Sequence, residues 1–180
     1  MLVINVPESE RWDEIKEEFV YVKACSLLLE HSLVSLQKWE AKWNVPFIDT
    51  NDKTEEQQLD YIRFMTMTKN VDPQVYYSLS AKNYSEINAY INAPMTATWF
   101  SGNNKKKKSS SRKVTAELIY YWMIAYGIPF ECRKWHLNQL LTLIEVCEEE
   151  GKEHQKKSRK QTLAEHSAIN KARRNKYKKR

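Results

Sequence analysis

Apolar residues recur three and four positions apart over most of the chain, which is the period of an amphipathic α-helix. From residue 32 onward this spacing predicts a helix with one buried stripe, made of Leu33, Leu36, Trp39 and Trp43. The helix should end before Pro46, because the residue that precedes a proline avoids helical dihedral angles.

Local start signals predict two further helices. Thr54 and Gln57 form a capping-box pattern, so a helix should start at Glu55. Its inward side chains are predicted to be Leu59, Ile62, Met65 and Phe64. Asp72 followed by Pro73 is typical of a helix start and predicts a short helix through Tyr76 and Tyr77.

Residues 85–92 are predicted to form another helix, which Pro94 stops. Its apolar face comprises Ile87, Tyr90 and Ile91. The N-terminal segments LVINV, at 2–6, and EFVYVKACSLLL, at 18–29, instead hold β-branched and aromatic residues in partial alternation. They predict two short strands that can pair.

The second half of the chain predicts a helical hairpin. Thr115 should cap a helix that ends at Gly127 and buries Leu118, Ile119, Trp122 and Ala125. A long helix over residues 131–151 should follow, with an apolar face of Leu137, Leu140, Leu141, Ile144 and Cys147.

These patterns predict a mainly α protein with a small N-terminal β element. Its parts are an N-terminal domain over 1–100, a flexible basic linker over 101–113, the helical hairpin over 114–150 and a tail over 151–180. The tail has almost no large apolar residues, so burial cannot offset its ordering entropy. We expect it to be mobile and partly helical. Only 3 Gly and 5 Pro occur in 180 residues, which also favours helix.

Charge is distributed unevenly around the net value of +6. Residues 1–104 carry −6 and residues 114–150 carry −4, whereas 105–113 carry +6 and the last thirty residues carry +10. This asymmetry indicates a charged partner. The candidate partner-binding residues are Lys105, Lys106, Lys107, Lys108, Arg159, Lys160, Lys171, Arg173, Arg174 and Lys176.

Catalytic and metal chemistry find little support. A zinc site would draw on Cys132, His136, Cys147 and His154. Their spacing is not one of the familiar zinc spacings, so buried thiols and a surface or capped histidine are the better interpretation. No nucleophile signature surrounds these residues, and the three glycines form no phosphate loop. We expect no enzyme activity, no cofactor and no metal.

Nucleic-acid binding is a second interpretation. The tryptophans Trp39, Trp43, Trp99, Trp122 and Trp135 could stack on bases, but they coincide with the apolar stripes or their edges, which favours core packing. The hairpin could pass for a helix-turn-helix, with reading residues Arg133, Lys134, Asn138 and Gln139, yet its segment is net negative. The basic tail is a better match for phosphates, and equally for docking a protein.

The first residues lack the shape of a signal peptide, and no segment approaches the apolar length of a membrane span. The three cysteines are far apart, as expected for reduced thiols. We therefore expect a cytosolic protein.

Several stretches carry a resemblance to a known family. They are LEHSLVSLQKWEAKW (29–43), YIRFMTMTKNVDP (61–73), INAYINAPMTATWFS (87–101), AELIYYWMIAYGIPFECRKWHLNQLLTLIEVC (116–147) and LAEHSAINKARRNKYKK (163–179). Together they resemble the tail assembly chaperones of long-tailed bacteriophages. The resemblance covers nearly all of the chain, and its motifs are packing patterns rather than catalytic signatures.

The resemblance implies a non-enzymatic role in the host cell cytoplasm. Such chaperones hold the helical tape measure protein, bring tail tube subunits to it and are absent from the mature virion. Self-association is a further partner expectation. By analogy, residues 1–104 bind the tape measure, and residues 114–180 recruit the tube protein with the help of the basic tail. The alternative is a phage protein that binds nucleic acid through its basic tail and hairpin.

The family typically occurs as a short product and a longer fusion, which is made when ribosomes slip one base near the end of the first reading frame. Asn and Lys codons are adenine-rich, so Asn103–Lys108 must come from a message on which such slippage is feasible. With this resemblance, we interpret the lysine run as a linker that is encoded by a slippery tract.

Overall fold

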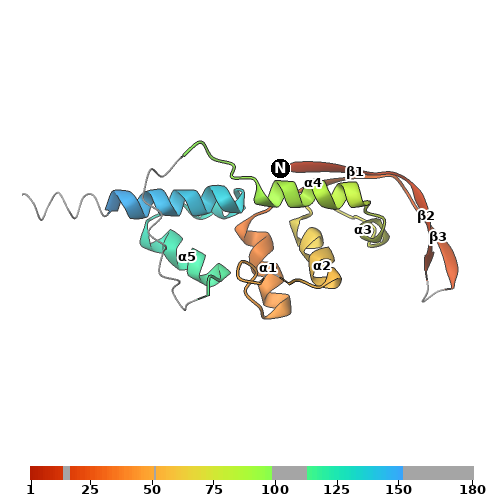
Figure 1. The fold of residues 1–180 in the computed structure, drawn as a ribbon, viewed down its shortest axis with the longest axis horizontal. Helices are drawn as coiled ribbons and strands as arrows, with labels where there is room; N and C mark the ends of the chain where they lie inside the picture. Colours follow the sequence, from red (N-terminus) through yellow and green to blue (C-terminus); the bar gives the residue numbers. More distant parts are fainter. Residues whose placement is uncertain (14–16, 51, 99–112, 152–180) are drawn as a thin grey trace, which may run out of the picture. The chain divides into compact units, whose positions relative to one another are not determined.

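A computed structural model describes residues 1–13, 17–50, 52–98 and 113–151 of the chain. Contacts within the chain group residues 1–142 into one compact unit and residues 143–180 into a second. The described residues are mainly helical with a small N-terminal β element, as the sequence predicts (Figure 1). None of the helices in this part of the chain combines the length and apolarity that a bilayer crossing needs.

Four short strands form the β element: β1 (Leu2–Val6), β2 (Ser9–Asp13), β3 (Glu18–Val22) and β4 (Cys25–Leu29). β1 pairs antiparallel with β4, and β2 pairs antiparallel with β3. The sequence predicted β1 and one strand across 18–29. β2 was not predicted, and residues 18–29 form two strands, β3 and β4, instead of one. β2 was missed because SERWD is mostly polar, and Pro7 between β1 and β2 cannot donate to a ladder.

The two strand pairs share one register. Val6 lies opposite Cys25, and three residues further Ser9 lies opposite Val22. No residue is therefore inserted on either side of the interruption at Pro7. Residues directly opposite each other in such a ladder project from the same face.

The two strand pairs form one two-stranded ribbon, and the face of this ribbon that is exposed changes along its length. In β1 and β4 the buried face carries Ile4, Val6, Leu27 and Leu29. In β2 and β3 the buried side chain is Val22, from the opposite face, and the Arg11 guanidinium lies 4.7 Å from the centre of the Tyr77 ring. The twist of the ribbon thus leaves an exposed aromatic face at this end, made of Trp12, Phe19 and Tyr21.

The first helices begin where the sequence predicts. α1 (Leu33–Trp43) starts after Ser32, whose hydroxyl accepts from the backbone N–H of Ser35. α2 (Glu55–Met65) starts after Thr54 with the expected capping box to Gln57. α3 (Gln74–Tyr77) follows the Asp72-Pro73 pair, and the Asp72 carboxylate accepts from the Gln74 N–H.

Two helix starts differ from expectation. α4 (Ala81–Asn92) begins four residues earlier than predicted, because Ser80 and Asn83 form a capping box in which Asn takes the place of the usual Glu or Gln. The single helix expected over 131–151 is wrong in its first part. Residues Phe130–Lys134 form a 3₁₀ helix, η1, and the α-helix runs over 137–151. Between them Trp135 is extended and His136 bridges to Ser32, which interrupts the helix.

α5 (Ala116–Ala125) is capped from a distance. Thr115 occupies the predicted N-cap position, yet its side chain makes no capping bond. The Ala116 N–H instead donates to Glu40 Oε2 at 2.7 Å, and the other oxygen of this carboxylate accepts from the Phe47 N–H at 2.8 Å. A carboxylate of α1 therefore holds both the 44–54 loop and the start of α5.

The buried side of α5 is rotated from the predicted stripe. Ala116, Ile119 and Met123 are buried, whereas Ala125 is exposed. The predicted stripe was wrong because α5 is apolar on nearly every side, so spacing alone does not select a face. Gly127 ends the helix as predicted, with a left-handed φ of 66° that favours glycine.

The core lies where α1 packs against α2, α5 and η1. Trp39 of α1 is fully buried and donates from Nε1 to the Gln57 carbonyl at 2.8 Å. Its ring meets that of Phe47 edge-on at 5.0 Å, and Phe47 stacks on Tyr61 at 4.0 Å between ring centres. α4 contacts β1 and lies alongside it in Figure 1.

We expect Glu40→Gln to lower the free energy of unfolding by about 1–3 kcal/mol. Two buried N–H groups each bind one oxygen of the Glu40 carboxylate, and an amide has only one acceptor oxygen. Urea denaturation of the full-length chain at pH 7 measures this. Glu117→Gln, which alters an exposed carboxylate in the first turn of α5, is the matched control. Equal stability of the two variants would contradict the role given to Glu40.

Candidate functional site

The described residues form a cleft of about 540 Å³. It is bounded by the loop before α2, by α2, by α4 and by the first turns of the helix over 137–151. Its aliphatic lining consists of Ile48, Ile62, Ile87, Ile91, Leu137 and Leu141. The amide side chains that also line it are Gln58, Asn88, Asn92 and Asn138.

Lys53 carries the cationic side chain of this cleft. Its Nζ lies 4.2 Å from the centre of the Phe47 ring and donates to the Thr50 carbonyl. Desolvation by burial lowers the pKa of the Lys53 ammonium from its ordinary value. No Asp or Glu lines the cleft, and Lys53 makes no ion pair within the part of the chain that the structure describes.

His31 lies at the cleft and belongs to a buried polar network. It is 2% exposed, and its Nδ1 lies 2.5 Å from the Tyr61 hydroxyl. The His31 and His136 rings meet edge-on with centres 5.0 Å apart. Burial lowers the pKa of His31 to about 3, and the nearby His136 acts in the same direction. His31 is therefore neutral at pH 7.

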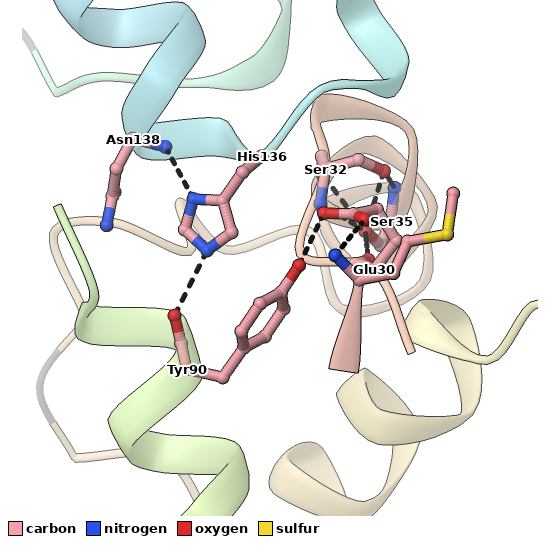
Figure 2. A network of polar contacts seen from close by, with 7 residues as sticks. Glu30, Ser32, Ser35, Tyr90, His136 and Asn138 are labelled. Carbon is pink, nitrogen blue, oxygen red and sulfur yellow. Dashed lines mark hydrogen bonds and ion pairs between the residues drawn. The ribbon is translucent and has the colours of Figure 1, made fainter. Parts of the chain in front are cut away.

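His136 is held in one tautomer by its two partners (Figure 2). Its Nε2 lies 3.0 Å from the Tyr90 carbonyl, which can only accept, so Nε2 carries the proton. Its Nδ1 accepts from the Asn138 N–H at 3.3 Å. Desolvation lowers the pKa of His136, opposed in part by the bond to Tyr90. The neutral ring thus satisfies both contacts.

The segment between β4 and α1 supplies the rest of the network. The Tyr90 hydroxyl donates to Glu30 Oε1 at 2.8 Å, while the Tyr90 carbonyl accepts from His136, so Tyr90 joins α4 both to this segment and to His136 (Figure 2). The Glu30 N–H donates to the Met65 carbonyl, and the His31 carbonyl accepts from the Leu137 N–H at 2.7 Å. These bonds bring α2, α4 and the helix over 137–151 together around the cleft.

The charged residues predicted from the sequence as partner-binding lie outside the described residues. They are Lys105–Lys108, Arg159, Lys160, Lys171, Arg173, Arg174 and Lys176. The structure consequently assigns them no place, and their role stays a prediction.

Of the residues considered for a zinc site or for reading DNA, Cys132 is buried, His136 and Asn138 have hydrogen-bond partners, and His154 lies outside the described residues. Cys132 is buried in η1, and His136 is occupied by Tyr90 and Asn138. Within the described ranges no group of three or more His, Cys, Asp or Glu could hold a metal ion. The Asn138 amide donates to the Ile91 and Ala93 carbonyls, which removes it as a base-reading group.

Tryptophan packing is only partly as expected. Trp39 is in the core, as predicted. Trp135 is 42% exposed, so core packing is wrong for it, because the 3₁₀ segment ends there and turns the side chain outward. Trp99 lies outside the described residues.

The cleft itself was not predicted. Its walls come from segments far apart in the sequence, and Ile62, Ile87, Ile91, Leu137 and Leu141 were predicted only as parts of apolar stripes. The one local signal is the repeated pair Ile87-Asn88 and Ile91-Asn92, which places amides beside apolar residues one turn apart on α4.

Comparisons of the chain with protein-family models, with curated proteins and with solved structures find no match. The description of the fold and of the cleft therefore rests on the structure alone.

We expect stability to fall as the pH is lowered below about 6.5. In the unfolded chain His31 binds a proton near pH 6.5, whereas in the folded chain burial keeps His31 neutral down to a pH of about 3. The sign follows from the lowered pKa in the folded state. Between pH 6.5 and 5.0 the loss from His31 alone should be about 2 kcal/mol. Urea denaturation at a series of pH values measures it.

His31→Asn is the matched variant, because its amide oxygen can still accept from Tyr61 and does not titrate. Its stability should fall less steeply over the same pH range. Parallel curves for the two proteins would show that His31 does not contribute to the pH dependence.

Proposed function

We propose that this protein is a tail assembly chaperone of a long-tailed bacteriophage, which binds the tape measure protein and recruits tail tube subunits during tail assembly. The resemblance of its sequence to that family supports the proposal. The observation in the structure that carries it is the open cleft, lined by both apolar and polar groups, between α2, α4 and the first turns of the helix over 137–151.

The chemistry of the cleft suits a helical partner. Amphipathic helices bind in apolar grooves through side chains spaced by one turn, while polar groups at the edge fix their orientation. Here six aliphatic side chains supply the apolar lining, and four amides supply hydrogen-bonding groups. A tape measure protein is a long helical chain, so it presents segments of this kind.

The recruitment of tube subunits is assigned to the segment from residue 114 onward, apart from Leu137, Asn138 and Leu141, which line the cleft. In its described part, Tyr121 and Ile124 of α5 are large apolar side chains left exposed, at 63% and 64%. Exposed apolar groups on one helix are suited to a protein partner. The basic tail would steer an acidic surface of the tube subunit. The protein would act in the host cytoplasm and leave before the virion matures.

Nucleic-acid binding is the second candidate, and the net charge of +10 over residues 151–180 favours it. Such binding would be sequence-blind and would weaken by orders of magnitude between about 50 and 200 mM salt.

Asn88→Trp should abolish co-purification with the tape measure protein, because a large ring at this exposed position of α4 would fill the cleft. The protein to test as the tape measure is the product of any very long helical reading frame found immediately downstream of this gene. The variant and that protein are co-expressed, and the captured fraction is measured on gels.

Ala89→Trp is the control, since Ala89 is exposed on the same helix and does not line the cleft. It should capture the tape measure as the unaltered protein does. If both tryptophan variants bind equally well, the cleft is not the site. If the unaltered chain captures no tape measure, the proposed function is wrong.

Replacing Arg173, Arg174 and Lys176 together by Gln should weaken capture of tube subunits and leave capture of the tape measure intact. The reason is that steering depends on charge in the tail, whereas the cleft is unchanged. Pull-downs with each partner measure the two activities separately. Unchanged tube capture, together with salt-sensitive binding of nucleic acid at 50 mM salt, would favour the second candidate.

A further inference from the structure

We propose that the cleft selects a helix that carries an acidic residue beside its apolar anchors, and that Lys53 is the specificity-determining residue that pairs with this carboxylate. The inference rests on the proposed function and names the chemistry of the partner segment. It concerns which part of a long helical protein the cleft accepts.

The charges around the cleft support this choice. Lys53 is half-buried against Phe47, and its lining neighbours are apolar groups, hydroxyls, amides and the neutral His31. Among the described residues no carboxylate forms an ion pair with Lys53. The lowered pKa of Lys53 has burial as its cause, with no acidic neighbour opposing it. The cleft therefore holds a partly desolvated ammonium that lacks an anion.

An occupant changes the environment of this ammonium further. A helix seated in the cleft would remove more water from Lys53, and a charged group that loses water without gaining a partner is costly. A carboxylate on the helix would supply a charge-assisted hydrogen bond in a sheltered place, where such bonds are strong. A helix with a basic residue at that point would be rejected. Lys53 thus provides both attraction and exclusion.

The extent of the cleft along α4 favours a helix over a compact ligand. The lining residues of α4 run from Tyr84 to Asn92, which is more than two helical turns. At the rise of an α-helix this corresponds to about 12 Å. Apolar and amide pairs recur along this strip one turn apart, at Ile87-Asn88 and Ile91-Asn92. A second helix that packs along α4 meets the same kind of contact on each turn.

The test uses the full-length chain and synthetic 25-residue peptides that tile the tape measure protein. Binding of labelled peptides is followed by fluorescence anisotropy. The peptides that bind should contain an acidic residue within their apolar face. Changing that residue to Lys should weaken binding to the unaltered chain by about tenfold or more. Lys53→Glu should restore the affinity of the changed peptide and lose that of the original one.

Two further variants guard against misfolding and non-specific charge effects. Lys53→Met keeps the packing of the aliphatic stem on Phe47, and should bind the original and changed peptides with similar affinity. Lys38→Glu makes the same charge change at an exposed position of α1 outside the cleft, and should leave both affinities unchanged.

The outcomes separate this inference from the proposed function. If Lys53→Glu binds the original peptide as tightly as the unaltered chain while Asn88→Trp does not, the role of Lys53 is wrong and the function stands. If no peptide binds and intact tape measure is not captured either, both fail. If native mass spectrometry finds a small carboxylate amphiphile bound to the unaltered chain and lost in Asn88→Trp, the helix is the wrong occupant.

Discussion

The hydrogen-bonding requirement of the buried segment 30–35 is the constraint on which the rest of the fold depends. This segment leaves a strand and enters a helix inside the protein, so its polar groups cannot turn to water. They are satisfied by the end of α2, by Tyr90 of α4 and by the start of the helix over 137–151. Elements far apart in the sequence are thereby fixed around this segment, and its His31 lines the cleft.

The helix starts were largely predictable from the sequence because their signals are local. Capping boxes such as Thr54 and Gln57 act within one turn, so a single sequence displays the whole interaction. The start of α5 depends on Glu40, which is 76 residues away, and no local pattern reveals that bond. The buried face of α5 was missed for a related reason, since only its packing against α1 distinguishes one apolar side from another.

The cleft shows that local sequence patterns are limited in the same way when they are used to predict function. The strongest chemical signals in the sequence are its lysine and arginine runs, and they lie outside the described residues. Lys53, in contrast, is one lysine in a polar loop, and only the fold places it over Phe47 and beside α4. Binding specificity of this type depends on which single charge is left without a partner after the chain has packed, a property that composition does not show.

The common register of the two strand pairs has a consequence for variation at the N-terminus. Because side chains alternate between faces, deletion of one residue at the interruption near Pro7 would move Trp12 from the exposed face to the side that carries Arg11. A second deletion at Lys23 or Ala24, on the opposite strand, would bring the pairing back into step but would leave both outer strands turned over, with the buried Val22 on the exposed face. The lengths of these two short segments should therefore be kept among natural variants, even though neither segment contributes to the core.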